Sequence, residues 1–265
     1  MRRRKSVTTI RHNDRDGSWR TFDTVTRGLM TLTPLERWLM HVEEIDRMAM
    51  TQDEPTAVAF SETIKAASWN AHEHAEHSRF LQDLLAGRLD RRRYADLVTQ
   101  HYFAYRVLEE ASVAMAADPI GERFAFPELH RLPALEADLA DLLGSEWASS
   151  IEPNSATLAY CDRLRATCFD WPGGYVAHHY VRYMGDLSGG QVIRRIVERT
   201  YQLPDHRGTR FYVFDEIGDL KAFKERYREL LDTTTWSPAE KDRIVEEILV
   251  AYQLNTEVID ALGAA

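Results

Sequence analysis

The chain has 265 residues, of which 44% are hydrophobic and 28% are charged, and these proportions are ordinary for a globular protein. A chain of this length can form one large domain whose core needs no disulfide or structural metal. The net charge of −9, from 33 lysines and arginines against 42 acids, argues against nucleic acid as the main partner.

The cysteines and the start of the chain indicate a compartment. The two cysteines, Cys161 and Cys168, form no CxxC pair, so we expect a reducing environment. No apolar run approaches the roughly 20 residues that a membrane span needs. The basic residues 1–6 are followed by no apolar signal segment. These features predict a cytoplasmic protein without a membrane anchor.

The first 57 residues differ in pattern from the rest of the chain. Residues 1–32 mix Arg, Asp, Thr and Gly without helical periodicity, which predicts a disordered N-terminal extension. Within residues 33–57, Thr33, Pro34 and Glu36 form a capping box with proline at the first helical position. Apolar residues then recur on one helical face, so we expect an additional capped helix that packs on the core.

From residue 58 onward, the sequence has helical periodicity and almost no period-two alternation. The predicted helices span residues 57–86, 91–117, 133–143, 154–169, 175–200, 219–232 and 237–263. Gly87 should end the first helix, and Asp90 should cap the second. Pro172-Gly-Gly174 should break the chain before the helix at 175–200. Residues 204–218 are predicted as a loop, with strand-like character at 211–214. The predicted fold class is all-α.

The most informative stretch is Tyr180-Val-Arg-Tyr-Met-Gly-Asp-Leu-Ser-Gly-Gly-Gln191, in which three glycines interrupt a helical pattern. Glycine inside a helix costs about 1 kcal/mol relative to alanine, so Gly185, Gly189 and Gly190 together cost roughly 3 kcal/mol. A chain tolerates this where something flat lies against bare backbone. Asp186, the one acid in the run, indicates a flat group that reacts rather than one that is only stored. We interpret the stretch as a helix laid across the face of a haem.

Three histidines, His72, His74 and His77, lie close together on the predicted first helix. Neither zinc-protease motif fits, because Glu76 and Glu73 stand where HExxH and HxxEH require histidine. We interpret His74 and His77 as solvated residues of a charged helix. His72 differs, because Glu76 lies four residues later on the same face and can orient the imidazole as an iron ligand.

With these motifs the chain resembles the haem oxygenases. Residues 185–190 match the distal-helix motif of that family, and His72 falls where the family has its proximal histidine. The resemblance covers roughly residues 58–262, whereas residues 1–57 have no counterpart. It implies a single haem-oxygenase-like helical bundle formed by residues 58–265. In that bundle, haem would lie between a proximal helix and the glycine-rich distal helix.

The resemblance also implies roles for individual residues. His72, oriented by Glu76, would be the axial ligand of the haem iron. The other haem-binding residues would be Lys65, Tyr180, Gly190, Lys224 and Arg228, with the three cations on the propionates. The catalytic residues would be Tyr105, Arg182, Gly185, Asp186, Gly189 and Asn255. Asp186 would hold a water that delivers a proton, while the glycines let the helix press on the ring. Each cation alone could be an ordinary surface residue, and Arg182 and Asn255 could serve helix packing or capping.

The activity implied by the resemblance is cleavage of haem b by dioxygen and reductant to biliverdin, ferrous iron and carbon monoxide. Haem would be both cofactor and substrate. The sequence has no flavin or iron–sulfur motif, so electrons would come from an external donor such as a ferredoxin or a flavoprotein reductase. One alternative is a non-catalytic haem carrier or sensor, against which Asp186 argues. The other is a helical di-iron or thiamine-type enzyme, which would leave the glycine run unexplained.

Overall fold

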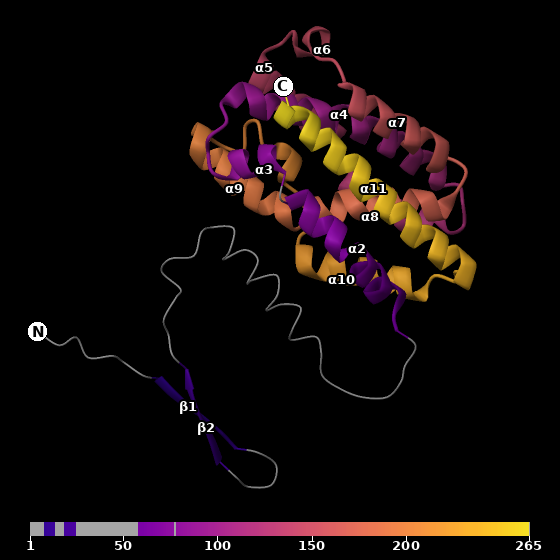
Figure 1. Cartoon of the computed structure of the whole chain (residues 1–265). Helices are drawn as coiled ribbons and strands as arrows, with labels where there is room; N and C mark the ends of the chain where they lie inside the picture. The colour runs from indigo at the N-terminus through magenta and orange to yellow at the C-terminus, as the bar shows by residue number, and fades with distance from the viewer. Residues whose placement is uncertain (1–7, 14–18, 25–57, 77, 265) are drawn as a thin grey trace, which may run out of the picture. The chain divides into compact units, whose positions relative to one another are not determined.

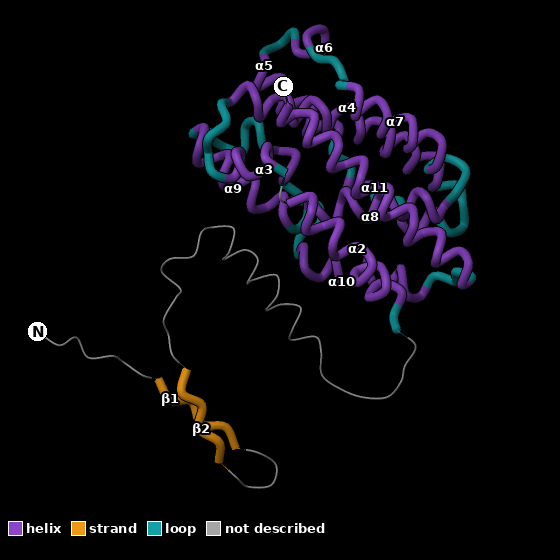
Figure 2. Tube along the Cα trace, viewed as in Figure 1, coloured by secondary structure: helices purple, strands orange, loops and turns teal. Residues whose placement is uncertain are grey.

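The computed structural model describes residues 8–13, 19–24, 58–76 and 78–264. The chain divides into two compact units, Met1–Thr56 and Ala57–Ala265 (Figure 1). Within the second unit, the described residues form helices joined by loops and turns (Figure 2). This unit has the all-α class that the sequence predicts. No helix of the described ranges is both long enough and apolar enough to cross a membrane.

The first unit contains an antiparallel hairpin of β1 (Thr8–Asn13) and β2 (Trp19–Thr24), with Thr8 opposite Thr24 and Asn13 opposite Trp19. Both strands contain β-branched or aromatic residues, which favour extended backbone. The hairpin therefore differs from the disordered extension predicted over residues 1–32. The capped helix predicted over residues 33–57 lies outside the described residues, and the division of the chain into these segments stays a prediction.

Two helices occupy the segment in which the sequence predicts one helix over residues 57–86. They are α2 (Phe60–Glu76) and α3 (Arg79–Leu85). Ser78 caps α3, because its hydroxyl accepts a hydrogen bond from a backbone N–H of the first turn at 3.3 Å. Periodicity does not detect such a cap inside a polar stretch, so the expectation of one continuous helix is wrong. Gly87 follows α3 with φ at +68°, as is typical of a helix C-terminus.

The next helices follow their predicted boundaries closely. α4 (Arg91–Met115) begins after Asp90, whose carboxylate accepts a hydrogen bond from the Arg93 N–H at 2.9 Å. α5 (Leu132–Leu143) and α7 (Ser155–Thr167) also agree with the prediction to within two residues at each end. The short elements between them are η1 (Gly121–Phe124), η2 (Pro127–Leu129) and α6 (Trp147–Ser150).

The glycine-bearing segment forms two helices, α8 (Pro172–Asp186) and α9 (Gly189–Tyr201), where the sequence predicts one helix over residues 175–200. The backbone leaves the helical range at Ser188, with φ −119° and ψ −88°. The expectation of a continuous helix is wrong here as well. The break lies inside the glycine run, between Asp186 and Gly189, where glycine weakens the helix most.

The start of α8 also differs from the prediction. Pro172 occupies the first helical position, where its missing N–H is not needed. Gly174 lies in the first turn, and a Cβ built on it would come within 2.4 Å of the Thr167 side chain. The proline and the glycines therefore allow α8 to begin early and pack closely on the end of α7, instead of breaking the chain.

The segment predicted to have strand-like character at 211–214 contains a short turn of helix, η3 (Arg210–Tyr212). Phe211 and Tyr212 are buried, so their apolar content reflects burial and not pairing with another strand. This expectation is therefore corrected, because the composition of a buried turn and of a short strand can be the same.

Two long helices complete the unit, α10 (Leu220–Thr233) and α11 (Pro238–Ala264). The predicted cap of α11 forms, because the Ser237 hydroxyl accepts a hydrogen bond from the Glu240 N–H at 3.2 Å. α11 packs against α2, α7 and α8 (Figure 1). It therefore forms the common support for the helices that carry the predicted site.

Candidate functional site

Asp186 is the last residue of α8, and its Oδ2 accepts a hydrogen bond from the hydroxyl of Tyr105. Tyr105 comes from α4 and is fully buried. Burial raises the pKa of Asp186 to about 6, although the Arg182 guanidinium and the tyrosine hydroxyl both favour the ionised form. A carboxyl group with a pKa in this range can take up and release a proton near neutral pH.

Arg182 lies one helical turn before Asp186, and its buried guanidinium contacts two other helices. Its central carbon lies 4.7 Å from the centroid of the Tyr105 ring on α4. One terminal nitrogen lies 2.9 Å from His101 Nδ1, and the other donates to the side-chain oxygen of Asn255 on α11. Burial lowers the pKa of His101, so the neutral ring accepts this hydrogen bond. Four predicted residues are therefore brought together, and the structure adds His101 to them.

The three glycines of the motif have different surroundings. Gly185 is exposed, and a Cβ built on it would meet no atom of the described structure within 4 Å. Gly189 is half-buried at the start of α9. Gly190 is buried, and a Cβ there would come within 2.9 Å of the Tyr212 ring. No described atom covers the backbone at Gly185, whereas the missing side chain of Gly190 makes room for the Tyr212 ring. The roles assigned to both glycines stay predictions.

The predicted propionate-binding cations lie on two helices that pack together, α2 and α10. Lys224 and Arg228 are four residues apart on α10, and Lys65 is on α2. The Lys224 ammonium donates to the hydroxyl of Ser188 at 3.0 Å, so this side chain reaches the break between α8 and α9. Arg228 is exposed and Lys65 is half-buried.

His72 and Glu76 lie toward the end of α2, and their side chains are outside the part of the chain that the structure describes. The assignment of His72 as an iron ligand therefore stays a prediction. α11 packs against both α2 and α8, so one helix supports the backbone that carries His72 and the backbone that carries Asp186. Tyr180, also on α8, is half-buried.

Two buried histidines precede the glycine motif on α8. His178 Nε2 lies 2.9 Å from Glu247 Oε1, and His179 Nδ1 lies 2.9 Å from the Tyr227 hydroxyl. The rings of His179 and Tyr227 are nearly parallel, with centroids 5.6 Å apart. Burial lowers the pKa of both histidines, that of His179 to about 3. Both rings are therefore neutral near pH 7, and they hold α8 in the core.

Sequence reasoning misses two residues of the site. His101 stands four residues before Tyr105 on α4, and this i,i+4 spacing is the signal that could have identified it. Gln191 is the last residue of the motif, and its side-chain nitrogen donates to the backbone oxygens of Asp186 at 3.2 Å and of Tyr212 at 2.8 Å.

The family model described as heme oxygenase matches residues 58–261 of this chain. The chain belongs to the haem oxygenase family. Its sequence is 37% identical to the heme oxygenase of Porphyra purpurea over 202 residues, which cover 76% of this chain and 86% of that protein. It is 35% identical to heme oxygenase 1 of Synechocystis sp. over 206 residues, which cover 78% of this chain and 85% of that protein.

Solved structures give the same family. The crystal structure of heme oxygenase-1 from Synechocystis sp. in complex with heme matches with a TM-score of 0.74 at 35% sequence identity, covering 78% of this chain and 93% of that chain. A TenA homologue from P. horikoshii matches with a TM-score of 0.60 at 16% identity, covering 77% of this chain and 98% of that chain. The second likeness concerns the fold alone.

Proposed function

We propose that this chain cleaves haem with dioxygen and external electrons, releasing biliverdin, ferrous iron and carbon monoxide. Haem oxygenases are oxidoreductases that degrade haem, and membership of the family makes this chain an enzyme of that class. The position of Asp186 is the observation that supports assigning this reaction to particular residues. Its carboxylate is bonded to Tyr105, and it adjoins Gly185, whose backbone no side chain of the described residues covers within 4 Å of a built Cβ.

The residues around Gly185 fit a haem. The glycine leaves room for a flat ring against the backbone of α8, and Lys224 places a cation beside Ser188 where α8 ends. Haem carries two carboxylates, which lysine and arginine bind through charge-assisted hydrogen bonds. The proposed haem-binding residues are His72 as the iron ligand, Glu76 as its partner, and Lys65, Tyr180, Gly190, Lys224 and Arg228 around the ring.

Bound haem supplies the iron at which dioxygen is activated, and it is also the substrate. The role of the protein in this reaction is to hold a proton and deliver it. We assign that part to Asp186, whose pKa of about 6 allows it to exchange a proton near neutral pH. Tyr105 holds Oδ2 of the carboxylate, and Arg182, bonded to Asn255, packs on the Tyr105 ring. A water held by the carboxylate would carry the proton toward the open side of Gly185.

The chemistry of the proton donor favours cleavage of the ring over peroxidase activity. An imidazole or guanidinium group directly beside the activated oxygen would promote cleavage of the oxygen–oxygen bond, as it does in peroxidases. In this site His101 and Arg182 bond to each other at 2.9 Å, and Arg182 is also bonded to Asn255. The carboxyl of Asp186, acting through water, is therefore our proposed proton source.

We further propose that dioxygen is the co-substrate and that a ferredoxin or a flavoprotein reductase supplies the electrons. Lys224 and Arg228 would place positive charge near the haem edge, which suits an acidic donor. Cys161 and Cys168 are free thiols in the structure, which is in keeping with a reducing compartment such as the cytoplasm.

Haem titration followed by turnover tests the proposed function. The full-length protein is loaded with haem, supplied with oxygen and either ascorbate or a ferredoxin system, and the pigment is extracted and identified. We expect biliverdin, with carbon monoxide and chelatable ferrous iron. Tight haem binding without biliverdin, in the presence of a competent donor, would instead identify a haem carrier or sensor on the same scaffold.

A further inference from the structure

The turn η3 packs against residues of the candidate site. Phe211, in the middle of this turn, is fully buried. Its ring centroid lies 5.1 Å from that of Tyr105 and 5.1 Å from that of His101. Tyr105 is the residue that donates to Asp186, and His101 is the partner of Arg182. The Phe211 ring therefore packs against both Tyr105, which bonds to Asp186, and His101, which bonds to Arg182.

The next residue of η3, Tyr212, contacts the glycine motif directly. Its ring fills the space left by Gly190, where a Cβ would come within 2.9 Å. Its backbone oxygen accepts a hydrogen bond from the Gln191 side chain at 2.8 Å, and the same nitrogen lies 3.2 Å from the backbone oxygen of Asp186. η3 therefore connects the end of α8 to the start of α9 across the break at Ser188.

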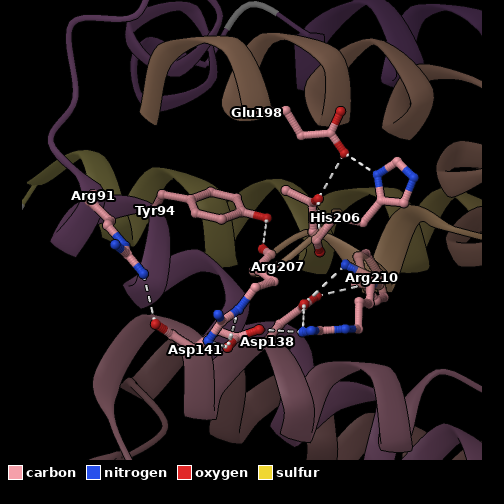
Figure 3. Close-up of polar contacts among 11 residues, drawn as sticks. Arg91, Tyr94, Asp138, Asp141, Glu198, His206, Arg207 and Arg210 are labelled. Carbon is pink, nitrogen blue, oxygen red and sulfur yellow. Dashed lines mark hydrogen bonds and ion pairs between the residues drawn. The ribbon is translucent and has the colours of Figure 1, made fainter. Parts of the chain in front are cut away.

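One buried carboxylate, Asp138 of α5, holds η3 in place (Figure 3). Its Oδ1 accepts a hydrogen bond from the Arg210 N–H at 2.9 Å, and its Oδ2 accepts one from the Phe211 N–H at 2.8 Å. Thr209, the residue before η3, makes no side-chain cap, so Asp138 satisfies the amides at the start of the turn. The Arg210 guanidinium lies 3.5 Å from Oδ1. Burial raises the pKa of Asp138 to about 6, against the effect of the two amides.

Asp141, one turn further along α5, provides a contrast (Figure 3). Its carboxylate binds guanidinium groups, with two nitrogens of Arg207 at 2.7 and 3.0 Å and one nitrogen of Arg210 as an ion pair. Both arginine side chains are substantially exposed, so solvent screens their side of these pairs. Asp138 and Asp141 therefore differ in kind: the first holds the backbone of η3, and the second holds side chains at the surface.

We propose that Asp138 is a positioning residue for the haem oxygenase reaction, which holds η3 so that Phe211 and Tyr212 fix the Tyr105–Asp186 pair. This inference rests on the proposed role of Asp186. Its physical basis is the acceptor capacity of a carboxylate, since both oxygens accept N–H groups. An asparagine at this position offers one acceptor oxygen, so one buried amide of η3 would face an NH2 group and lose its partner.

The test compares Asp138→Asn with the matched control Asp141→Asn in the full-length chain. The main measurement is the pH midpoint at which the absorbance of the ferric haem complex changes from the water-ligated to the hydroxide-ligated form. We expect Asp138→Asn to shift this midpoint by about half a pH unit or more, because distal hydrogen bonds set it. The initial rate of biliverdin formation should fall about tenfold, since small displacements of catalytic groups reduce rates strongly. Asp141→Asn should match the parent in both measurements.

Hydrogen exchange in the haem-free protein provides a readout that does not depend on turnover. The backbone amide of Phe211 should exchange faster in Asp138→Asn than in Asp141→Asn, because only the first change removes a carboxylate oxygen to which the η3 amides bond. A lower melting temperature of Asp138→Asn with a parent-like pH midpoint and rate would overturn the proposal, because Asp138 would then serve stability alone.

Two further variants distinguish a wrong role for Asp186 from a wrong role for Asp138. Asp186→Asn tests the proposed role of Asp186 directly: if it leaves the midpoint and the rate unchanged, that role is wrong whatever Asp138 does, whereas the absence of biliverdin from the parent would reject the proposed function itself. If Asp186→Asn changes both and Asp138→Asn changes neither, only the positioning inference is wrong. Should Asp138→Asn fail to fold, Phe211→Leu tests the same connection by removing the ring between Tyr105 and His101. A parent-like midpoint in Phe211→Leu would then overturn the inference.

Discussion

The hydroxyl of Tyr105 donates a hydrogen bond to Oδ2 of Asp186, and this bond joins the middle of α4 to the end of α8. Burial raises the pKa of the tyrosine well above its usual value, and the neighbouring carboxylate raises it further. Tyr105 therefore remains a donor throughout the neutral range. One oxygen of Asp186 is held by the protein, so changes at Asp186 should affect proton delivery without removing the surface on which haem is proposed to lie.

Replacing Asp186 by alanine should abolish most biliverdin formation while leaving haem affinity near that of the parent. The carboxylate is expected to contact water and not the iron or a propionate, and loss of an acid–base group reduces rates by about 10²–10⁴-fold. Asp186→Asn should fall between the two, because an amide can orient a water but transfers its proton poorly. Haem titration, single-turnover absorbance and oxidation of added phenols check this prediction. Undiminished biliverdin from Asp186→Ala would show that the proton comes from elsewhere.

The same residue should limit stability in a pH-dependent way. The pKa of Asp186 rises from 3.8 to about 6 on folding, so the folded protein favours the protonated carboxyl. That favourable contribution is fully present below pH 3.8 and is lost as the pH rises through 6. Asparagine resembles the protonated form, so haem-free Asp186→Asn should match the parent near pH 4 and exceed it above pH 7 by about 1–3 kcal/mol. Denaturant unfolding at both pH values measures this, and a gain of equal size at both would contradict the linkage.

Capping residues and hydrophobic periodicity in the sequence were sufficient to predict most of the helices. The side chains of Asp90 and Ser237 form the caps that their positions predict, and the helices that follow them begin as expected. The sequence could not locate the breaks at Ser78 and Ser188, because periodicity reports which face is apolar and not whether the backbone is continuous. A short polar cap or a pair of glycines changes the backbone without changing that pattern.

The site was less accessible to sequence reasoning than the helices. The motif names Asp186 and Gly185 as site residues, but the need for glycine at position 190 comes from the ring of Tyr212, which lies in η3 and outside the motif. Asp138 bonds to the Phe211 amide across 73 positions of sequence, and no local pattern distinguishes it from Asp141 three residues later. Such contacts depend on which helices become neighbours, and a single sequence carries little information about that.

Glu247 should contribute strongly to stability at neutral pH. Burial alone would raise its pKa, but hydrogen bonds from His178 and Arg163 bring it down from 4.5 to about 2. The contribution is therefore present above pH 4.5 and is lost as the pH falls toward 2. Glu247→Gln should lower the free energy of unfolding by about 2–3 kcal/mol at pH 7 and by much less at pH 3. Asp162→Asn, in an exposed pair with Arg165, is the control and should change stability little.

The proposed iron ligand is tested by removing it and supplying a substitute. His72→Ala should lose haem binding of native spectral character, because the iron would have no imidazole from α2. Free imidazole should partly restore the spectrum and the turnover by occupying the space that the side chain leaves. His74→Ala is the control and should resemble the parent, since His74 lies on another face of the helix. Turnover by His72→Ala at the parent rate without imidazole would reject this ligand and leave His74 and His77 as candidates.

Removing the two cations of α10 should weaken haem binding and loosen its seating. Lys224 and Arg228 lie one turn apart, and Lys224 reaches Ser188 at the break between α8 and α9. Together Lys224→Ala and Arg228→Ala should reduce haem affinity by about 1–3 kcal/mol, the range for hydrogen bonds to charged groups. A haem that can rotate in its plane would also be cleaved at more than one meso carbon, so the extracted pigment should contain mixed biliverdin isomers.

Lys221→Ala removes the same charge from an exposed position of the same helix, where Lys221 pairs with Glu225 at 3.9 Å, and should alter neither affinity nor isomer. If the double variant and this control bind haem equally well and both yield a single isomer, Lys224 and Arg228 are ordinary surface cations and the propionates are held elsewhere.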